Sequence, residues 1–73
     1  MTPKSTKQII KEIGIKGLDL FQDEDFWYFE FDRGDVYELQ AVSGVSRLHD
    51  MSLEEWVRIG TDFGEQMMER LDA

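Results

Sequence analysis

Apolar residues near the start of the chain recur at helical spacing. Three isoleucines within residues 9–13 lie on one side of a helical projection, and Gly14 follows them directly. Isoleucines spaced in this way form the apolar stripe of an amphipathic helix, and a glycine after such a stripe often ends it. Thr2 and Pro3 have the order of an N-cap and a first helical residue. The pattern therefore predicts a short helix over residues 3–13.

The pattern then changes from helical spacing to alternation. Residues 15–22 alternate loosely and predict a short first strand, followed by an acidic turn at residues 22–25. Side chains of a strand point alternately to its two faces. The next strand therefore places three bulky aromatic side chains on one face, which are Trp27, Phe29 and Phe31. Its opposite face carries Phe26, Tyr28, Glu30 and Asp32.

The turn after this strand decides which side chains of the hairpin meet, because paired residues point to the same face. The apolar set of the following strand is Tyr37, Leu39 and Ala41, and the mixed set is Val36, Glu38 and Gln40. A three-residue turn over residues 32–34, closed by a left-handed Gly34, would place Phe29 opposite Tyr37 and Trp27 opposite Leu39. This register predicts an apolar inner face. It also predicts an outer face on which Phe26 and Tyr28 lie among Glu30, Glu38 and Gln40.

A helix start is encoded at residues 51–56, Met-Ser-Leu-Glu-Glu-Trp. Ser52 and Glu55 have the spacing of a capping box, so we expect a helix from Leu53 to about Leu71. Its apolar side consists of Leu53, Trp56, Val57, Gly60, Phe63, Gly64, Met67, Met68 and Leu71. The two glycines on this side each cost roughly 1 kcal/mol of helix propensity relative to alanine. They predict a close approach to the aromatic sheet face or to another helix.

Together these elements predict a single small acidic domain over residues 1–73. It is a two-layer α+β fold with a short N-terminal helix, an antiparallel β-hairpin or three-stranded meander, and a long C-terminal helix. The chain contains no cysteine, so disulfides and thiolate zinc sites are excluded as stabilising elements. Aromatic packing is expected to take their place.

Charge is unevenly distributed along the chain. The formal net charge is -8. Residues 1–17 carry four lysines against one glutamate, whereas residues 18–73 carry four arginines against fifteen carboxylates. A polyanion repels nucleic-acid phosphates, so we expect a basic protein partner and no direct nucleic-acid binding. No segment resembles a signal peptide or a membrane span, so we expect a cytoplasmic protein without membrane partners.

Candidate catalytic groups are few. His49 and Asp50 could act as a general-base pair, but adjacent residues rarely have that geometry, and the chain has no second histidine. The acids at residues 23–25 lack the alternating ligands and the glycine of a calcium loop. We therefore expect no enzyme activity, no catalytic residue, no cofactor and no metal.

The sequence favours a non-enzymatic interaction module, an inhibitor or adaptor that binds a basic partner through an acidic, aromatic hairpin face. The expected anchors are Phe26 and Tyr28, because aromatic residues dominate binding hot spots. The carboxylates expected to steer the partner are Asp23, Glu24, Asp25, Glu30 and Glu38. One alternative is a DNA mimic that occupies the basic groove of a nucleic-acid-binding or defence enzyme, as phage-encoded inhibitors do. Another is a homodimeric structural protein that associates through Gly60 and Gly64.

Overall fold

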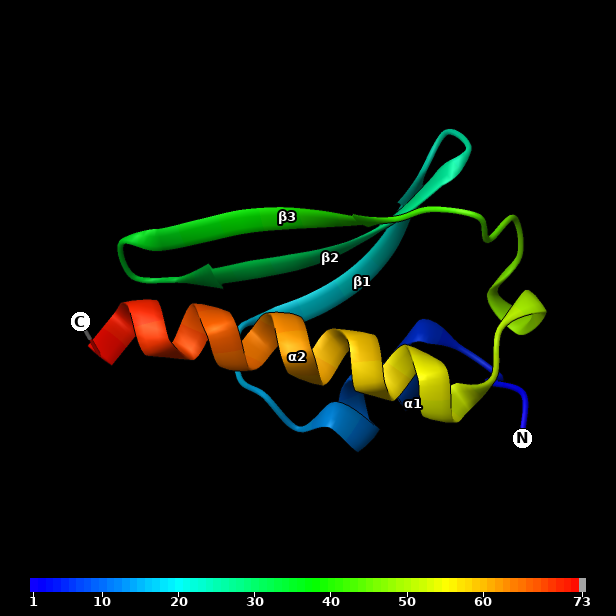
Figure 1. Ribbon diagram of the computed structural model, residues 1–73, viewed down its shortest axis with the longest axis horizontal. Coiled ribbons are helices and arrows are strands. Elements are labelled where there is room, and N and C mark those ends of the chain that lie inside the picture. Colours follow the sequence, from blue (N-terminus) through cyan, green and yellow to red (C-terminus); the bar gives the residue numbers. More distant parts are fainter. Residues whose placement is uncertain (73) are drawn as a thin grey trace.

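The computed structural model describes residues 1–72. A short helix is followed by a three-stranded antiparallel meander and a long C-terminal helix, as Figure 1 shows. The elements are α1 (Thr6–Ile13), β1 (Leu18–Asp23), β2 (Phe26–Arg33), β3 (Val36–Val42), the 3₁₀ turn η1 (Leu48–Asp50) and α2 (Leu53–Asp72). The predicted small α+β fold is confirmed, with the meander rather than the hairpin alone.

Helix α1 begins three residues later than the sequence predicted. Its N-cap is Ser5, not Thr2, because the Ser5 hydroxyl accepts a hydrogen bond from the backbone N–H of Gln8 at 3.2 Å. The residues before it run beside the start of α2, where the Leu53 N–H donates to the Met1 carbonyl at 2.8 Å. This contact holds the first residues outside the helix.

Gly14 ends α1 as predicted. It lies in the left-handed conformation, with φ of 71°, and its N–H donates to the Ile10 carbonyl at 3.0 Å. The strand expected over residues 15–22 is present as β1, shifted to Leu18–Asp23. Strand β1 pairs antiparallel with β2 along the whole length of β1. A turn at residues 24–25 joins the two strands.

The predicted turn between β2 and β3 is wrong. A two-residue turn of Gly34 and Asp35 joins the strands, so Phe31 lies opposite Glu38, and Phe29 lies opposite Gln40. Gly34 has φ of 57°, and a glycine with positive φ at the first position suits a type II′ turn, whose twist matches that of the strands.

The faces of β3 are consequently reversed from those predicted. Tyr37, Leu39 and Ala41 lie on the face away from the helices. On the helix side only the two ends of β3, Val36 and Val42, are buried. Glu38 and Gln40, which lie between them on this side, stay exposed although α2 packs against β3 as well as β2. A mixed set can therefore face the helix layer.

The helix side of the sheet and the two helices enclose an aromatic core. The large side chains that are fully buried are Trp56, Phe29, Phe31 and Ile9. The Trp56 ring meets Trp27 and Phe29 edge to face, with centroid distances of 5.8 Å and 6.1 Å. Its indole N–H donates to the Leu48 carbonyl at 2.8 Å, which satisfies the only polar group that the ring buries.

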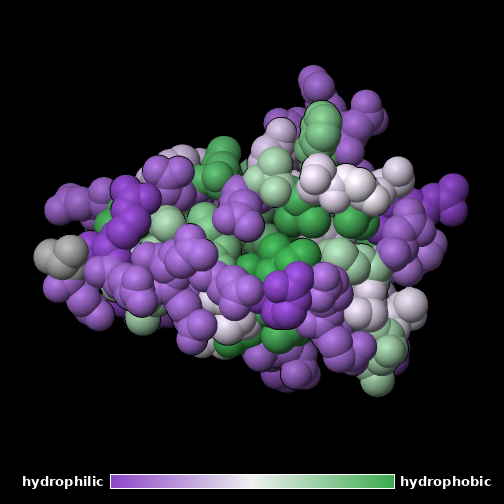
Figure 2. All heavy atoms as spheres, in the orientation of Figure 1, coloured by the Kyte–Doolittle hydropathy of each residue, from purple (hydrophilic) through white to green (hydrophobic). Residues whose placement is uncertain are grey.

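Helix α2 begins at the predicted position. The backbone N–H of Glu55 donates to the Ser52 hydroxyl at 3.1 Å. The Glu55 carboxylate accepts hydrogen bonds from Arg58 at 2.7 Å and 2.8 Å, and these bonds hold the pKa of Glu55 below its usual value. In Figure 2, hydrophilic atoms cover much of the outward surface of α2, and hydrophobic atoms gather where the helix meets the strands. Within residues 1–72 no helix has both the length and the apolar character that crossing a membrane requires.

The two glycines of α2 allow the predicted close approach. A Cβ on Gly60 would lie 2.7 Å from Cε1 of Phe29 and would also overlap Ile13. A Cβ on Gly64 would lie 2.5 Å from Cδ1 of Ile15. The sheet and the α1–β1 connection of the same chain therefore cover the two glycines at which a homodimer was expected to associate.

Candidate functional site: the open face of the sheet

Among the described residues, no helix lies on one face of the three-stranded sheet. Helices α1 and α2 lie side by side against the other face (Figure 1), with α1 packed on β1 and α2 packed on β2 and β3. We call the uncovered surface the open face. It consists of ten residues: Asp19, Phe21, Asp23, Phe26, Tyr28, Glu30, Asp32, Tyr37, Leu39 and Ala41. Four of them are carboxylates, six are apolar or aromatic, and none is basic.

The apolar side chains of the open face form a continuous group across all three strands. Phe21 and Tyr28 lie opposite each other on β1 and β2, and their rings stack with centroids 5.7 Å apart. Phe26, Tyr37 and Leu39 are 49%, 54% and 44% exposed, respectively. Scattered exposed apolar residues are ordinary, but a contiguous group of this kind is typical of binding surfaces.

A carboxylate is tied into this group. The Tyr37 hydroxyl donates a hydrogen bond to Oε2 of Glu30 at 3.0 Å. This bond, with smaller contributions from desolvation and from the charges of Glu30 and Asp32, raises the pKa of Tyr37 above its ordinary value. Tyr37 therefore stays protonated and remains a hydrogen-bond donor at neutral pH.

The turn between β1 and β2 forms an acidic tip next to the open face. Asp23, Glu24 and Asp25 are contiguous and exposed, and this hairpin end projects from the body of the molecule (Figure 1). Glu24 has φ of 56°, the one positive value at a non-glycine residue within residues 1–72. Such a backbone costs about 1–3 kcal/mol, and strain of this kind is often found at functional positions.

Six of the seven predicted partner-binding residues come together in this region. Asp23, Phe26, Tyr28 and Glu30 lie on the open face, and the other two occupy the tip. The seventh, Glu38, was expected on the same face and lies on the helix side of β3. There its carboxylate is 3.4 Å from the guanidinium of Arg70 on α2. The misplacement follows directly from the misassigned turn.

The sequence interpretation missed four apolar members of the open face. Tyr37, Leu39 and Ala41 were assigned to the core, and Phe21 was assigned to no face. The sequence did contain a usable signal. If Gly34 and Asp35 are taken as a two-residue loop with glycine at its first position, the observed register follows. In that register Val36 and Val42, the β-branched ends of β3, fall on the buried face.

The other candidate chemistry does not assemble into a site. Nε2 of His49 lies 4.0 Å from Oδ1 of Asp50, and both side chains are largely exposed. Among residues 1–72 no three histidine, aspartate or glutamate side chains are grouped so as to hold a metal ion.

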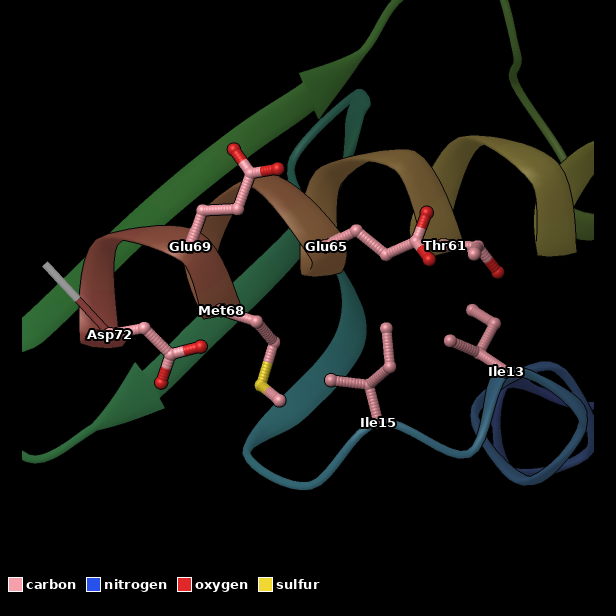
Figure 3. A pocket seen from close by; sticks show the side chains of 7 residues that line it. All are labelled: Ile13, Ile15, Thr61, Glu65, Met68, Glu69 and Asp72. Atoms are coloured by element: carbon pink, nitrogen blue, oxygen red, sulfur yellow. The ribbon is translucent and has the colours of Figure 1, made fainter.

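A shallow hollow of about 550 Å³ lies on the opposite side of the molecule, between α2 and the α1–β1 connection. Its lining residues are Ile13, Ile15, Thr61, Glu65, Met68, Glu69 and Asp72. Figure 3 shows Ile15 and Met68 pointing toward each other across it, while the Glu69 carboxylate points away. The polar groups do not converge on a common point, so the hollow does not form a built ligand site.

Compared with protein-family models, curated proteins and solved structures, the chain matches none of them. A functional assignment therefore rests on the residues of this chain alone.

Proposed function

We propose that this chain is a non-enzymatic protein-binding module, an inhibitor or adaptor, whose open face binds a basic surface of a partner protein. One observation carries this proposal: a continuous group of half-exposed aromatic and aliphatic side chains is set among four carboxylates, with no basic residue on the face. The chemistry of this surface complements a partner that offers both apolar contacts and lysine or arginine side chains.

The aromatic side chains supply the expected binding energy. Phe26 and Tyr28 were the anchors expected from the sequence, and the observed register adds Tyr37 and Leu39 on the same face. Large aromatic groups at the centre of an interface commonly contribute most of its affinity. Tyr37 also presents a hydroxyl whose orientation Glu30 already fixes, so little ordering is needed when a partner binds.

The carboxylates orient the basic partner and increase its association rate. The acidic tip extends beyond the apolar group, and the acids of the open face lie between the aromatic side chains. Charges placed at a rim accelerate association with a basic partner and make the rate depend on salt. We expect the association rate to fall with ionic strength more steeply than the dissociation rate rises.

The test uses matched pairs of variants. The partner is captured from lysate at low salt, purified, and titrated against the full chain. The apolar variant combines Phe26→Ala and Leu39→Ala, and its control is Met68→Ala, a 36%-exposed residue on α2. The charge variant combines Glu30→Gln and Asp32→Asn, and its control combines Glu65→Gln and Glu69→Gln on the outer side of α2.

The open-face variants should each weaken binding about tenfold or more, and the controls less than about threefold. Equal losses in the two charge variants would mean that overall acidity, not this face, attracts the partner. Unchanged binding by the apolar variant would remove the open face from the interface. Circular dichroism of each variant confirms that it is folded.

DNA mimicry is the second candidate, because exposed carboxylates also line the outer side of α2, away from the open face. The exposed acids there are Glu54, Asp62, Glu65, Glu69 and Asp72. A mimic would occupy a DNA-binding groove, so double-stranded DNA should compete with this chain for the partner. Competition by DNA together with sensitivity to the α2 charge variant would favour the mimic over the open-face module.

A further inference from the structure

We infer that the outer edge of β3 accepts a basic, extended segment of the partner as a fourth antiparallel strand. This inference rests on the proposed function and specifies how the partner is bound. It concerns the edge of the sheet, whereas the proposed function concerns the open face.

The edge of β3 is suited to strand addition. The strand order is β1-β2-β3, so β3 pairs with β2 on one side only. Its seven residues continue the register from Val36 to Val42 without a bulge, and they include neither proline nor lysine. Bulges, prolines and lysines are the usual features that prevent pairing at an exposed edge.

The alternation of hydrogen bonds along the hairpin identifies the outward backbone groups. Hydrogen-bonded and non-hydrogen-bonded pairs alternate in an antiparallel ladder, and a hydrogen-bonded pair closes a two-residue loop. Since Arg33 and Val36 close this loop, the N–H and C=O groups of Tyr37, Leu39 and Ala41 point away from β2.

The opposite edge of the sheet is blocked by its own side chains. On β1 the same alternation points the N–H of Leu20 away from β2. This N–H group donates a hydrogen bond to Oδ1 of Asp19 at 2.8 Å. Helix α1 packs against β1 and helix α2 against β3, both from the helix side of the sheet, so these packing contacts do not distinguish the two edges. Within the part of the chain that the structure describes, β3 has no side-chain cap of this kind. The free edge is therefore β3.

The side chains flanking this edge select a basic strand. On the helix side an added strand would lie beside Glu38, which is half-exposed and faces only Arg70 at 3.4 Å. On the open side it would lie beside Tyr37 and Leu39. Because cross-strand neighbours of opposite charge stabilise a sheet, the fitting segment alternates lysine or arginine with apolar residues.

A second copy of the chain fits this edge less well. Antiparallel pairing of two β3 strands centred on Glu38 would place two carboxylates side by side, and each copy carries a formal net charge of -8. Like charges directly opposite each other destabilise a pair of strands. The structure thus favours a basic partner over self-association at this edge.

The experiment uses the ¹⁵N-labelled full chain and a synthetic peptide, acetyl-Lys-Val-Lys-Val-Lys-Val-Lys-amide. In the antiparallel arrangement the valines lie opposite Tyr37, Leu39 and Ala41, so the valine N–H groups face β3 and the lysine N–H groups face solvent. Two further peptides carry N-methyl groups, one on the valines and the other on the inner lysines. The three peptides have the same charge and the same side chains.

The unmodified peptide should slow amide exchange at Tyr37, Leu39 and Ala41. N-methylation of the valines should weaken binding about tenfold or more, since several hydrogen bonds are lost, whereas N-methylation of the lysines should change it less than about threefold. Glu38→Gln should weaken binding more than Glu65→Gln does. Equal losses from the two methylated peptides would overturn the inference.

The outcomes separate the two proposals. If the captured partner depends on the open face but leaves the β3 amides unprotected, the edge inference fails and the proposed function stands. If the same amides are protected without peptide, in a dimer that sedimentation detects, the occupant is a second copy and the inference is overturned. If neither surface responds to the partner, both proposals fail.

Discussion

Both faces of the sheet carry aromatic side chains, but those on one face are buried and those on the other are at least partly exposed. On β2, Phe29 and Phe31 point toward the helices and are fully buried, while Phe26 and Tyr28 point the other way and are only partly covered. The residues that pack against each face determine whether its aromatic side chains are buried. Trp56 and the close approach of Gly60 cover one face, and no helix formed by residues 1–72 covers the other. Aromatic content alone therefore does not indicate a core.

Charged side chains are also distributed differently between the core and the open face. No polar or charged residue is buried among residues 1–72, whereas the open face places four carboxylates among its aromatic side chains. Carboxylates of this kind repel a second copy of the chain and attract a basic surface.

The largest expected effect on stability comes from replacing one phenylalanine on each face by alanine. Phe29→Ala should lower the free energy of unfolding by about 3–5 kcal/mol, because a fully buried ring leaves a cavity beside Trp56. Phe26→Ala, on the same strand, should lower it by less than about 1 kcal/mol. Urea denaturation followed by circular dichroism measures both. Similar losses at the two positions would contradict the division between faces.

The glycines of α2 give the next effect. Gly60→Ala should destabilise the fold by about 1–2 kcal/mol, because the overlap with the buried Phe29 ring outweighs the gain in helix propensity. Gly64→Ala meets only the flexible end of the Ile15 side chain, so its effect should be close to zero. Thermal unfolding of the two variants compares them, and an equal loss would show that the sheet does not set the tight packing of α2.

At the acidic tip a glycine should stabilise the fold. Glu24→Gly removes the strain of a positive φ at a non-glycine residue and should raise the free energy of unfolding by about 0.5–1 kcal/mol. Its control is Asp25→Gly, where φ is not positive and glycine should destabilise slightly. A loss of stability in Glu24→Gly would mean that the Glu24 side chain contributes to the fold.

The smallest effect concerns the titration of Tyr37. Glu30→Gln should lower the pKa of Tyr37 toward its ordinary value, because the hydrogen bond to Glu30 is the largest cause of the rise. Since the folded-state pKa is raised, protonated Tyr37 stabilises the fold below pH of about 10. This contribution is lost as the pH rises through the raised pKa. NMR of labelled tyrosine Cζ follows the titration, and an unchanged pKa in the variant would contradict the assigned cause.

The local patterns were sufficient for the element types and for much of the core. Ser52 and Glu55 marked the start of α2, the glycines marked its close packing, and alternation separated the two faces of β2. Each of these features depends on neighbours within a few residues. For the same reason Phe26 and Tyr28 could be placed on an outer face from the sequence.

The orientation of β3 could not be read from the strand itself. Its apolar residues occur on both faces, so the choice of turn decided which face met the core, and both turns were compatible with glycine. The observed register exposes Tyr37 and Leu39 and leaves Glu38 beside Arg70. That arrangement follows from the two-residue turn at Gly34 and Asp35, so the wrong choice of turn placed all three residues on the wrong face.

The central claim is that the open face binds the partner, and chemical-shift mapping of the ¹⁵N-labelled chain with the purified partner tests it most directly. The largest changes are expected at Phe21, Phe26, Tyr28, Tyr37 and Leu39. Little change is expected along the outer side of α2. Changes concentrated on α2 or around Ile15 and Met68, with an unperturbed open face, would contradict the account.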